Sequence, residues 1–464
     1  MKKMMHHTVI VLLCCLFHAA SGQQARQEVF ESLEKTGGVY YAYPHKNPKQ
    51  GAAPEGYTPC YVSHYGRHGS RWLLSEKQYD GVLKILDDAD SARALSPLGK
   101  DVHRRVAIVC RDGAGRAGEL SPLGFRQQRE IAGRMFRAFP AVFQGQTSVN
   151  ARSTTVPRCM LSMMAFCDRM KELNPDISFA FQANAETSAC LNPISRQHNP
   201  AIDRQYIDWM YADSASWRKE QRRFIEERLH VKRFVDALFA DGEYAERSVE
   251  GGRLMNGLFQ LASDVQNTGL DVSLYDVFEK EELYVLWLSS NFEHYALRGL
   301  YPPNRSYPAR YASALVKDIV CRADSALQNG APAADLRFGH DGSIMALAAL
   351  LQLEGCDARE TDPETVGQYW KSFRIAPMAA NICLVFYKKD AASDILLKIL
   401  HNEAETRIPV PTDIFPYYRW KDVKRFYIEK LDRISQKYMS TSYNYMSTTY
   451  NYMTMTYTIY VDDI

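Results

Sequence analysis

The stretch Tyr65-Gly-Arg-His-Gly-Ser-Arg71 places two arginines around one histidine, directly after a short run of aromatic and β-branched residues. That run, residues 57–63, is predicted to be a strand. Arg67, His68 and Arg71 are therefore expected where this strand ends. In an open α/β sheet, ligands bind at the carboxyl ends of the parallel strands. The stretch thus predicts an α/β fold with a site at one edge of its sheet.

Two later segments repeat this arrangement of a strand followed by polar residues. Residues 147–152 are predicted to be a strand that ends with Arg152, and residues 335–339 a strand followed by His340 and Asp341. Because parallel strands end at one edge, the side chains from all three strand ends are expected to meet. The candidate site residues are Arg67, His68, Arg71, Arg152, His340 and Asp341.

These residue types suit the transfer of a phosphoryl group without a metal or another cofactor. Three guanidiniums can each bind two oxygens of a tetrahedral oxyanion and neutralise the charge that builds up. An unprotonated His68 between two of them can attack phosphorus, and Asp341 can protonate the leaving alkoxide. His340, cationic at mildly acidic pH, can bind a further oxygen. A helix predicted to start near Ser70 would add backbone N–H groups.

Each motif also has a structural interpretation. Arg-His-Gly-x-Arg arises by chance in roughly one in several hundred chains of this length, and His-Asp is far commoner. Arg152 and the residues after it also suit a strand end followed by a helix cap, with Arg158 on the surface of that helix. The order of the motifs, and their position at three predicted strand ends, favours the functional interpretation.

The remaining pattern predicts an α/β fold whose mainly parallel sheet is flanked by helices, with an inserted all-helical cap. Helices are expected to start at Ser96-Pro97 and Ser121-Pro122, and strands at residues 381–387 and 395–400. Residues 200–330 read as almost wholly helical. The expected domains are an α/β core, a helical cap and a low-complexity tail containing a near-repeat of seven residues. Their expected boundaries are 23–160 with 331–435, 161–330, and 436–464.

Composition and the first residues indicate an exported protein with a small-molecule partner. The 464 residues carry 56 Lys and Arg against 54 Asp and Glu, which gives no reason to expect nucleic acid or an anionic membrane as partner. Residues 1–22 contain basic residues, then an apolar run and then small residues, the order found in a secretory signal peptide. A periplasmic or secreted protein is therefore expected. Lipid attachment at Cys14 or Cys15 is the less favoured alternative. The other eight cysteines permit disulfides, but their pairing and the oligomeric state are not readable.

Taken together, the motifs resemble those of the histidine acid phosphatases, the branch of the histidine phosphatase superfamily with phytases, glucose-1-phosphatases and multiple inositol polyphosphate phosphatases. The matching stretches are Tyr65–Arg71, Glu119–Gln128, Asn150–Arg158 and Phe338–Gly342. The resemblance implies that Arg67, Arg71, Arg152 and His340 bind phosphate, that His68 is the nucleophile and that Asp341 is the proton donor. It also implies a helical cap over the substrate cleft.

Two departures from the family pattern leave the substrate open. Trp72 stands where many members have Pro soon after the first motif, and His-Asp-Gly replaces the His-Ala-Glu of the inositol polyphosphate phosphatases. Length and the run 374–381 still resemble that group most. We therefore expect a phosphomonoesterase that forms a phosphohistidine and acts on inositol polyphosphates such as phytate. Glucose-1-phosphatase or broad acid phosphatase activity is the alternative within this class.

Two alternatives belong to other classes. One is an inactive phosphosugar-binding protein, which would need the arginines but neither His68 nor Asp341. The other is an intracellular mutase, which the predicted signal peptide disfavours. A substrate with many phosphates would need extra cations, although the arginines available in the segment 100–137 also suit a solvated helix face. They are Arg104, Arg105, Arg126, Arg129 and Arg134.

Overall fold

The computed structural model describes residues 24–44, 48, 50–195, 204–390 and 393–450. Its centre is one sheet, with strand order β3-β2-β4-β1-β5-β6-β7 and β8 paired with β6. The half that contains the motifs is parallel and consists of β1 (Thr58–Arg67), β2 (Thr147–Ser153), β3 (Ile177–Gln182) and β4 (Ala334–Gly339). The other half pairs antiparallel and consists of β5 (Asn381–Lys388), β6 (Leu396–His401), β7 (Ala404–Glu405) and β8 (Tyr417–Arg419).

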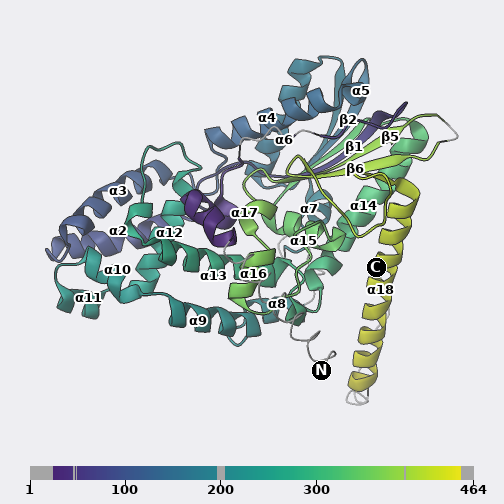
Figure 1. Cartoon of the computed structure of the whole chain (residues 1–464). Helices are drawn as coiled ribbons and strands as arrows, with labels where there is room; N and C mark the ends of the chain where they lie inside the picture. The colour runs from purple at the N-terminus through teal and green to yellow at the C-terminus, as the bar shows by residue number, and fades with distance from the viewer. Residues whose placement is uncertain (1–23, 45–47, 49, 196–203, 391–392, 451–464) are drawn as a thin grey trace, which may run out of the picture.

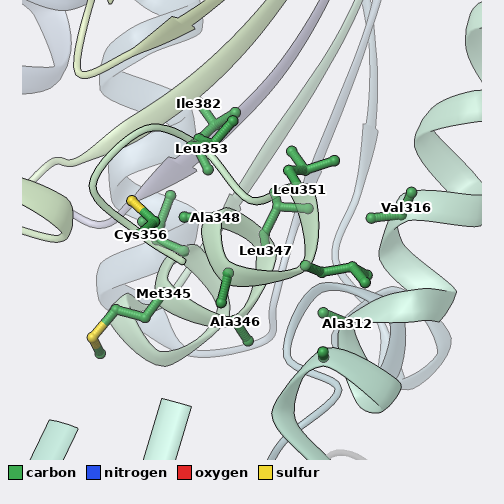
Figure 2. Packing of buried hydrophobic residues seen from close by; sticks show 14 of the residues in the cluster. Ala312, Val316, Met345, Ala346, Leu347, Ala348, Leu351, Leu353, Cys356 and Ile382 are labelled. Carbon is green, nitrogen blue, oxygen red and sulfur yellow. The ribbon is translucent and has the colours of Figure 1, made fainter. Parts of the chain in front are cut away.

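Helices cover both faces of this sheet, as expected for an α/β fold (Figure 1). One face packs against α4 (Pro122–Ala138), α5 (Pro140–Phe143) and α6 (Pro157–Leu173). The other packs against α7 (Ala185–Leu191), α14 (Tyr307–Asn329), α15 (Asp341–Leu351) and α18 (Trp420–Tyr450). Figure 2 shows part of this second core, in which apolar side chains of α15 gather with those of α14 and with Ile382 of β5. All five strands predicted from the sequence are present.

A helical lobe lies beside the sheet and has a core of its own (Figure 1). Its helices include α2 (Glu76–Ser91), α3 (Pro97–Gly113), α9 (Ser216–Arg228), α10 (Val231–Leu238), α11 (Gly242–Ser248), α12 (Gly251–Val265) and α13 (Lys280–Arg298). Helix α8 (Arg204–Tyr211) instead packs against the end of α13 and the start of α14. Between the lobe and the sheet lie η1 (Leu33–Tyr40), α16 (Pro363–Tyr369) and α17 (Ser372–Ile375). The short turns η2 (Tyr275–Val277) and η3 (Pro302–Asn304) complete the chain path.

The predicted boundary between core and cap at residue 160 is corrected by this arrangement. Strand β3 lies beyond residue 160 but pairs with β2 in the main sheet. Helices α2 and α3 lie before it but pack with α10 and α12 in the lobe. The chain thus enters the lobe twice. The predicted boundary rested on the long helical segment after residue 200, and it missed the first entry because α2 and α3 come soon after strand β1.

Local signals at helix starts are confirmed in two places and wrong in one. Ser96 and Ser121 cap α3 and α4, each accepting a hydrogen bond from the glycine N–H three residues on, at 3.0 and 3.2 Å. The helix expected near Ser70 does not exist. Instead α2 begins at Glu76 and is capped by Ser75. Residues 68–75 therefore form an irregular connection, and no helix dipole acts on His68 from that side.

Several other expectations concern the ends of the chain and its cysteines. The predicted signal peptide, residues 1–22, lies outside the described residues, as do Cys14 and Cys15. Helix α18 continues to Tyr450 and so includes much of the predicted low-complexity tail. The eight cysteines from Cys60 to Cys383 are free thiols. Among the described residues, no helix combines the length and apolar character needed to cross a bilayer.

Candidate active site

The end of β1 carries the central residues, and its neighbours hold them in register. The backbone N–H of Arg67 donates to the carbonyl of Ala380, and that of His68 to the carbonyl of Gly339 at the end of β4. The N–H of Ala379 donates in turn to the carbonyl of His68. His68 therefore lies at the sheet edge between two strands, in a backbone position fixed from both sides.

Two glycines let the connection after β1 pack directly on the start of α4. A Cβ on Gly69 would lie 2.4 Å from the carbonyl oxygen of Gly124, and a Cβ on Gly124 would lie 2.2 Å from that of Ser70. Neither position can accept a side chain without moving backbone. The N–H of Ser70 donates to Gln127 on α4 at 2.9 Å. The close contact explains why the motif needs glycine after its histidine.

The imidazole of His68 is held as a neutral ring with one nitrogen available. Its Nδ1 lies 2.9 Å from the carbonyl of Gly69, and since a carbonyl only accepts, Nδ1 carries the proton. The ring is 2% exposed, and burial lowers the pKa of His68 well below its usual value. The cationic Arg158, Arg67 and Arg71 lower this pKa further. Nε2 thus keeps its lone pair even in mildly acidic solution.

Arg67 and Arg71 flank this histidine and are both buried. Arg67 donates to the carbonyl of Ala376 at 2.8 Å and to Asp341 Oδ2 at 3.1 Å. Burial lowers the pKa of Arg67 to about 10, with Asp341 opposing the change. Arg71 donates to the carbonyl of Trp72, and its guanidinium lies 5.0 Å above the ring of Tyr40. Arg67 is therefore ion-paired with Asp341, whereas Arg71 contacts a carbonyl group and an aromatic ring.

The third arginine of the site is Arg158, in the first turn of α6. It exerts the largest charge effect on His68, and it also acts on Arg67 and Arg71. Burial lowers the pKa of Arg158, and the charge on Arg71 contributes to this. The sequence offered a signal for this placement, because Pro157 begins the helix one residue earlier. The alternative interpretation, with Arg158 on the surface of that helix, does not fit, because the half-buried Arg158 acts on His68.

His340 and Asp341 complete the site from the start of α15. The imidazoles of His340 and His68 lie edge to face with 5.8 Å between ring centroids. His340 Nε2 lies 3.3 Å from the hydroxyl of Thr154 and 3.7 Å from Cys159 Sγ. Burial raises the pKa of Asp341, but Arg67 and the neighbouring histidines outweigh this effect and lower it well below its usual value. In the free protein Asp341 is a carboxylate.

A histidine of the helical lobe also acts on this carboxylate. His294 of α13 is the second strongest charge that lowers the pKa of Asp341, after Arg67. Arg298, one turn further along α13, places its Nε 2.9 Å from the position of a Cβ on Gly342. This face of α13 therefore lies against the turn that carries Asp341. Sequence reasoning missed His294, because no local pattern links residue 294 to residue 341.

Arg152 is not brought together with the other five predicted residues. It forms a bidentate ion pair with Asp318 of α14, at 3.1 and 2.6 Å. In the sheet, Arg152 of β2 pairs with Arg337 of β4, and Arg337 pairs with Tyr65 of β1. Arg152 is therefore two residues further from the sheet edge than Arg67. Side chains of a strand alternate between its faces, so Arg152 points towards α14 below the edge. Its predicted contact with phosphate is corrected accordingly.

Three of the extra arginines proposed for a highly charged substrate form ion pairs with residues outside this site. Arg129 pairs with Asp168 and Glu172, and Arg134 pairs with Glu403. Arg105 pairs with Asp276 in the lobe. Trp72, where the family pattern has Pro, is buried, and its Nε1–H donates to Asp112. These three arginines are therefore ion-paired, as the alternative expected, although Arg105 and Arg134 are largely buried rather than solvated.

Two buried arginines and a half-buried one around a neutral histidine, with a carboxyl group beside them, define a phosphoryl-transfer hydrolase of the α/β class. The sequence matches the family described as the histidine phosphatase superfamily (branch 2) over residues 67–402. The chain therefore belongs to this family and is a phosphatase. No curated protein matches the chain.

Solved structures with the same fold include inositol phosphate enzymes. A multiple inositol polyphosphate phosphatase from Bifidobacterium longum, in complex with inositol hexasulfate, is 17% identical, with a TM-score of 0.69 over 84% of this chain and 97% of that one. The same enzyme in complex with phosphate gives 0.66 at 19% identity, covering 86% and 98%. The phytase from D. castellii gives 0.59 at 15% identity, covering 86% and 85%. These likenesses confirm the predicted fold.

Proposed function

We propose that this phosphatase hydrolyses phosphate monoesters through a phosphohistidine at His68. The observation that carries the proposal is the tautomer of His68. Because Nδ1–H donates to the carbonyl of Gly69, the lone pair is on Nε2. A phosphate bound by Arg67, Arg71 and Arg158, with His340 beside it, would present its phosphorus to this nitrogen. A protein that only binds phosphate needs the cations but not a histidine held neutral in this way.

The chemistry needs one proton transfer in each half of the reaction. Nε2 forms a bond to phosphorus while the ester P–O bond breaks, and the leaving oxygen takes a proton from Asp341. In the second half, water attacks the phosphohistidine and returns a proton to the Asp341 carboxylate. The N–P bond breaks, and phosphate and neutral His68 are released. No metal or other cofactor enters this sequence.

The proton on Asp341 would arrive with the substrate. In the free protein, Arg67 and the nearby histidines keep the pKa of Asp341 low. A bound phosphate dianion adds negative charge and takes up part of the charge of Arg67, and both effects raise the pKa of Asp341. Uptake of a proton is easier as the pH falls, whereas His68 stays neutral. The pair is thus suited to activity at mildly acidic pH.

For the substrate, we propose inositol polyphosphates such as phytate. The support comes from the similar solved structures, whose titles name inositol polyphosphate phosphatase and phytase. Glucose 1-phosphate or a broad range of monoesters is the second candidate, because Arg129 and Arg134 of the segment 100–137 form ion pairs with residues outside the site. Export to a periplasm or the exterior is part of the proposal and rests on residues 1–22 alone.

The test is phosphate release from phytate, glucose 1-phosphate and p-nitrophenyl phosphate at pH 5 and pH 7, with chelator present. We expect release by the wild type, loss of at least about 10⁴-fold in His68→Ala, and a labelled phosphohistidine only in the wild type. His103→Ala is the matched control, because His103 is a histidine of the lobe that contacts Asp87. Equal activity of wild type and His68→Ala would refute the nucleophile, and the ranking of substrates decides between the two candidates.

A further inference from the structure

Helices α4 and α6 carry a groove that the proposed reaction does not use. The two helices pack side by side and bury their apolar faces against the sheet (Figure 1). A groove of about 490 Å³ lies over them. Five of its seven lining residues are arginines: Arg126, Arg129, Arg134, Arg137 and Arg169. This arginine groove is the most basic surface feature that the segment 100–137 contributes to.

The spacing of the sequence places four of these arginines on one face of α4. The lining positions 126, 129, 130, 133, 134 and 137 follow one another at the intervals of a single helix face. Arg126 and Arg129 are three residues apart, and so are Arg134 and Arg137. Like charges at this spacing repel and weaken a helix. A helix face built at this cost indicates binding rather than folding.

Three of the five arginines are held by carboxylates. Arg129, Arg134 and Arg169 form ion pairs, and their partners are Asp168, Glu172, Glu403 and Glu130. The pairs fix the directions of these guanidiniums and offset part of their charge. All four carboxylates are already engaged in this way.

Arg126 and Arg137 are different, because no carboxylate offsets them. Both are exposed, and neither forms a hydrogen bond or an ion pair within the part of the chain that the structure describes. A Cβ on Gly133 would lie 3.3 Å from a terminal nitrogen of Arg137 and 3.7 Å from Nε of Arg169. Two guanidiniums therefore lie over the same glycine. Their charges repel, and an anion bound between them would relieve the repulsion.

The groove begins close to the candidate active site. Gln127 of α4 accepts from the N–H of Ser70 at 2.9 Å, and Gln128 donates to the carbonyl of Arg67 at 2.9 Å. Both glutamines are buried, whereas Arg126 beside them in the sequence is exposed. One turn of α4 therefore contacts the site on its buried side and lines the groove on its exposed side.

We propose that the arginine groove is a second binding site, separate from His68, for soluble molecules that carry several phosphate groups on neighbouring carbon atoms. Each guanidinium can bind two oxygens of one phosphate, so a row of them suits a ligand with several phosphates. Such a ligand engages several arginines at once, whereas a single phosphate engages few, so affinity should rise with the number of phosphates. The choice of inositol polyphosphates as the ligand rests on the proposed function.

The test is calorimetric titration of the whole protein with inositol hexasulfate at low ionic strength, where exposed charges are least screened. We expect the wild type to bind one molecule more than the double variant Arg126→Gln with Arg137→Gln. In that variant the additional binding should be weakened by about tenfold. Equal binding, in number and affinity, by the two proteins would overturn the proposal.

A double variant of the lobe, Arg247→Gln with Arg253→Gln, is the matched control. It removes the same charge from two exposed arginines of α11 and α12, so it should bind the probe as the wild type does. An equal loss in both double variants would reduce the effect to net charge and contradict the proposal. Inorganic phosphate is the second probe, and additional binding of it as tight as that of inositol hexasulfate would also contradict the proposal.

Folding of the variants is checked by thermal unfolding, which should be unchanged because Arg126 and Arg137 are exposed and unpaired among the described residues. If the double variant fails to fold, Arg137→Gln alone provides the test, with the additional binding weakened by about threefold. No change in that variant would contradict the proposal. Failure of the proposed function is distinguishable, since the wild type would then release no phosphate from phytate while the difference in binding persists.

Discussion

Two clusters of three arginines lie in the parallel half of the molecule, and they differ in what lies at their centre. In one, Asp318 contacts Arg152, Arg322 and Arg337, with donor-to-oxygen distances of 2.6 to 3.1 Å. In the other, Arg67, Arg71 and Arg158 act together on His68. Asp341 lies to one side of this second cluster and contacts Arg67.

The difference separates a structural cluster from a functional one. Burial raises the pKa of Asp318, but Arg337, Arg152 and Arg322 outweigh this effect and lower it. The arginines of the first cluster are therefore ion-paired within the fold. In the second cluster Arg71 lowers the pKa values of Arg67 and Arg158, and all three arginines lower that of His68, so a bound anion would relieve their repulsion. A count of arginines near strand ends does not distinguish the two.

The largest effect expected from this comparison concerns Asp341, the acid beside the functional cluster. Asp341→Asn should lower kcat on phytate or glucose 1-phosphate by about 10²–10⁴, because an alkoxide cannot leave without a proton. The loss should be much smaller on p-nitrophenyl phosphate, since nitrophenolate leaves unprotonated. Steady-state kinetics on both substrates measures this. An equal loss of kcat on both kinds of substrate would mean that Asp341 only positions Arg67 and does not donate a proton.

The next effect distinguishes Arg158 from Arg152 directly. Arg158→Ala should lower kcat/KM by about 10²–10³, as the loss of one preorganised donor to a transferring phosphoryl group does. Its thermal unfolding should change little, because its one backbone contact, to the carbonyl of Gly118, is long at 3.5 Å. Kinetics and calorimetry on the same preparation provide both readings. Full activity of this variant would show that Arg158 does not belong to the site.

A smaller effect, on stability, is expected for Arg152. Arg152→Ala removes two hydrogen bonds to a half-buried carboxylate and should lower the free energy of unfolding by about 2 kcal/mol. Activity per folded molecule should persist. Denaturant unfolding measures the change, with Arg129→Ala at a more exposed ion pair as control. If Arg152→Ala instead stays stable and loses activity, the comparison fails and the sequence-based assignment of Arg152 is right.

The smallest effect is a shift in pH dependence. Burial and Arg158 both keep the pKa of His68 well below its usual value, so the wild type should remain active at pH 5. A histidine with a lowered pKa loses its lone pair only when the pH falls through that lowered value. Arg158→Ala removes a positive charge, so the fall of kcat/KM at low pH should move to higher pH by about one pH unit. A profile of kcat/KM between pH 4 and pH 8 tests this, and an unshifted profile would contradict it.

Local patterns in the sequence predicted most elements of the sheet and several of the site residues. Five strands lie where alternation and β-branched residues placed them, and Ser96 and Ser121 cap helices as expected. Such signals depend on residues within one or two turns of each other. Strands β3, β7 and β8 were missed, because the latter two are short and β3 is exposed over much of its length.

The errors in the site share one cause. Arg152 and Arg158 both lie near the end of β2, and only the pairing of β2 with β4 shows that Arg152 is two residues below the edge. His294 comes from α13, far along the chain from the Asp341 carboxylate on which it acts. No spacing in the sequence reports such contacts.

By itself, the sequence determined the chemistry available to this protein: a histidine between arginines after one strand, a His-Asp pair after another, and glycines where backbones must touch. These features depend on residue type and on neighbours in the chain. Tertiary structure alone decided which arginine completes the site, which carboxylates compensate its charge and which nitrogen of His68 is available. Charge and burial act through space, so the same arginine side chain stabilises the fold at position 152 and acts on His68 at position 158.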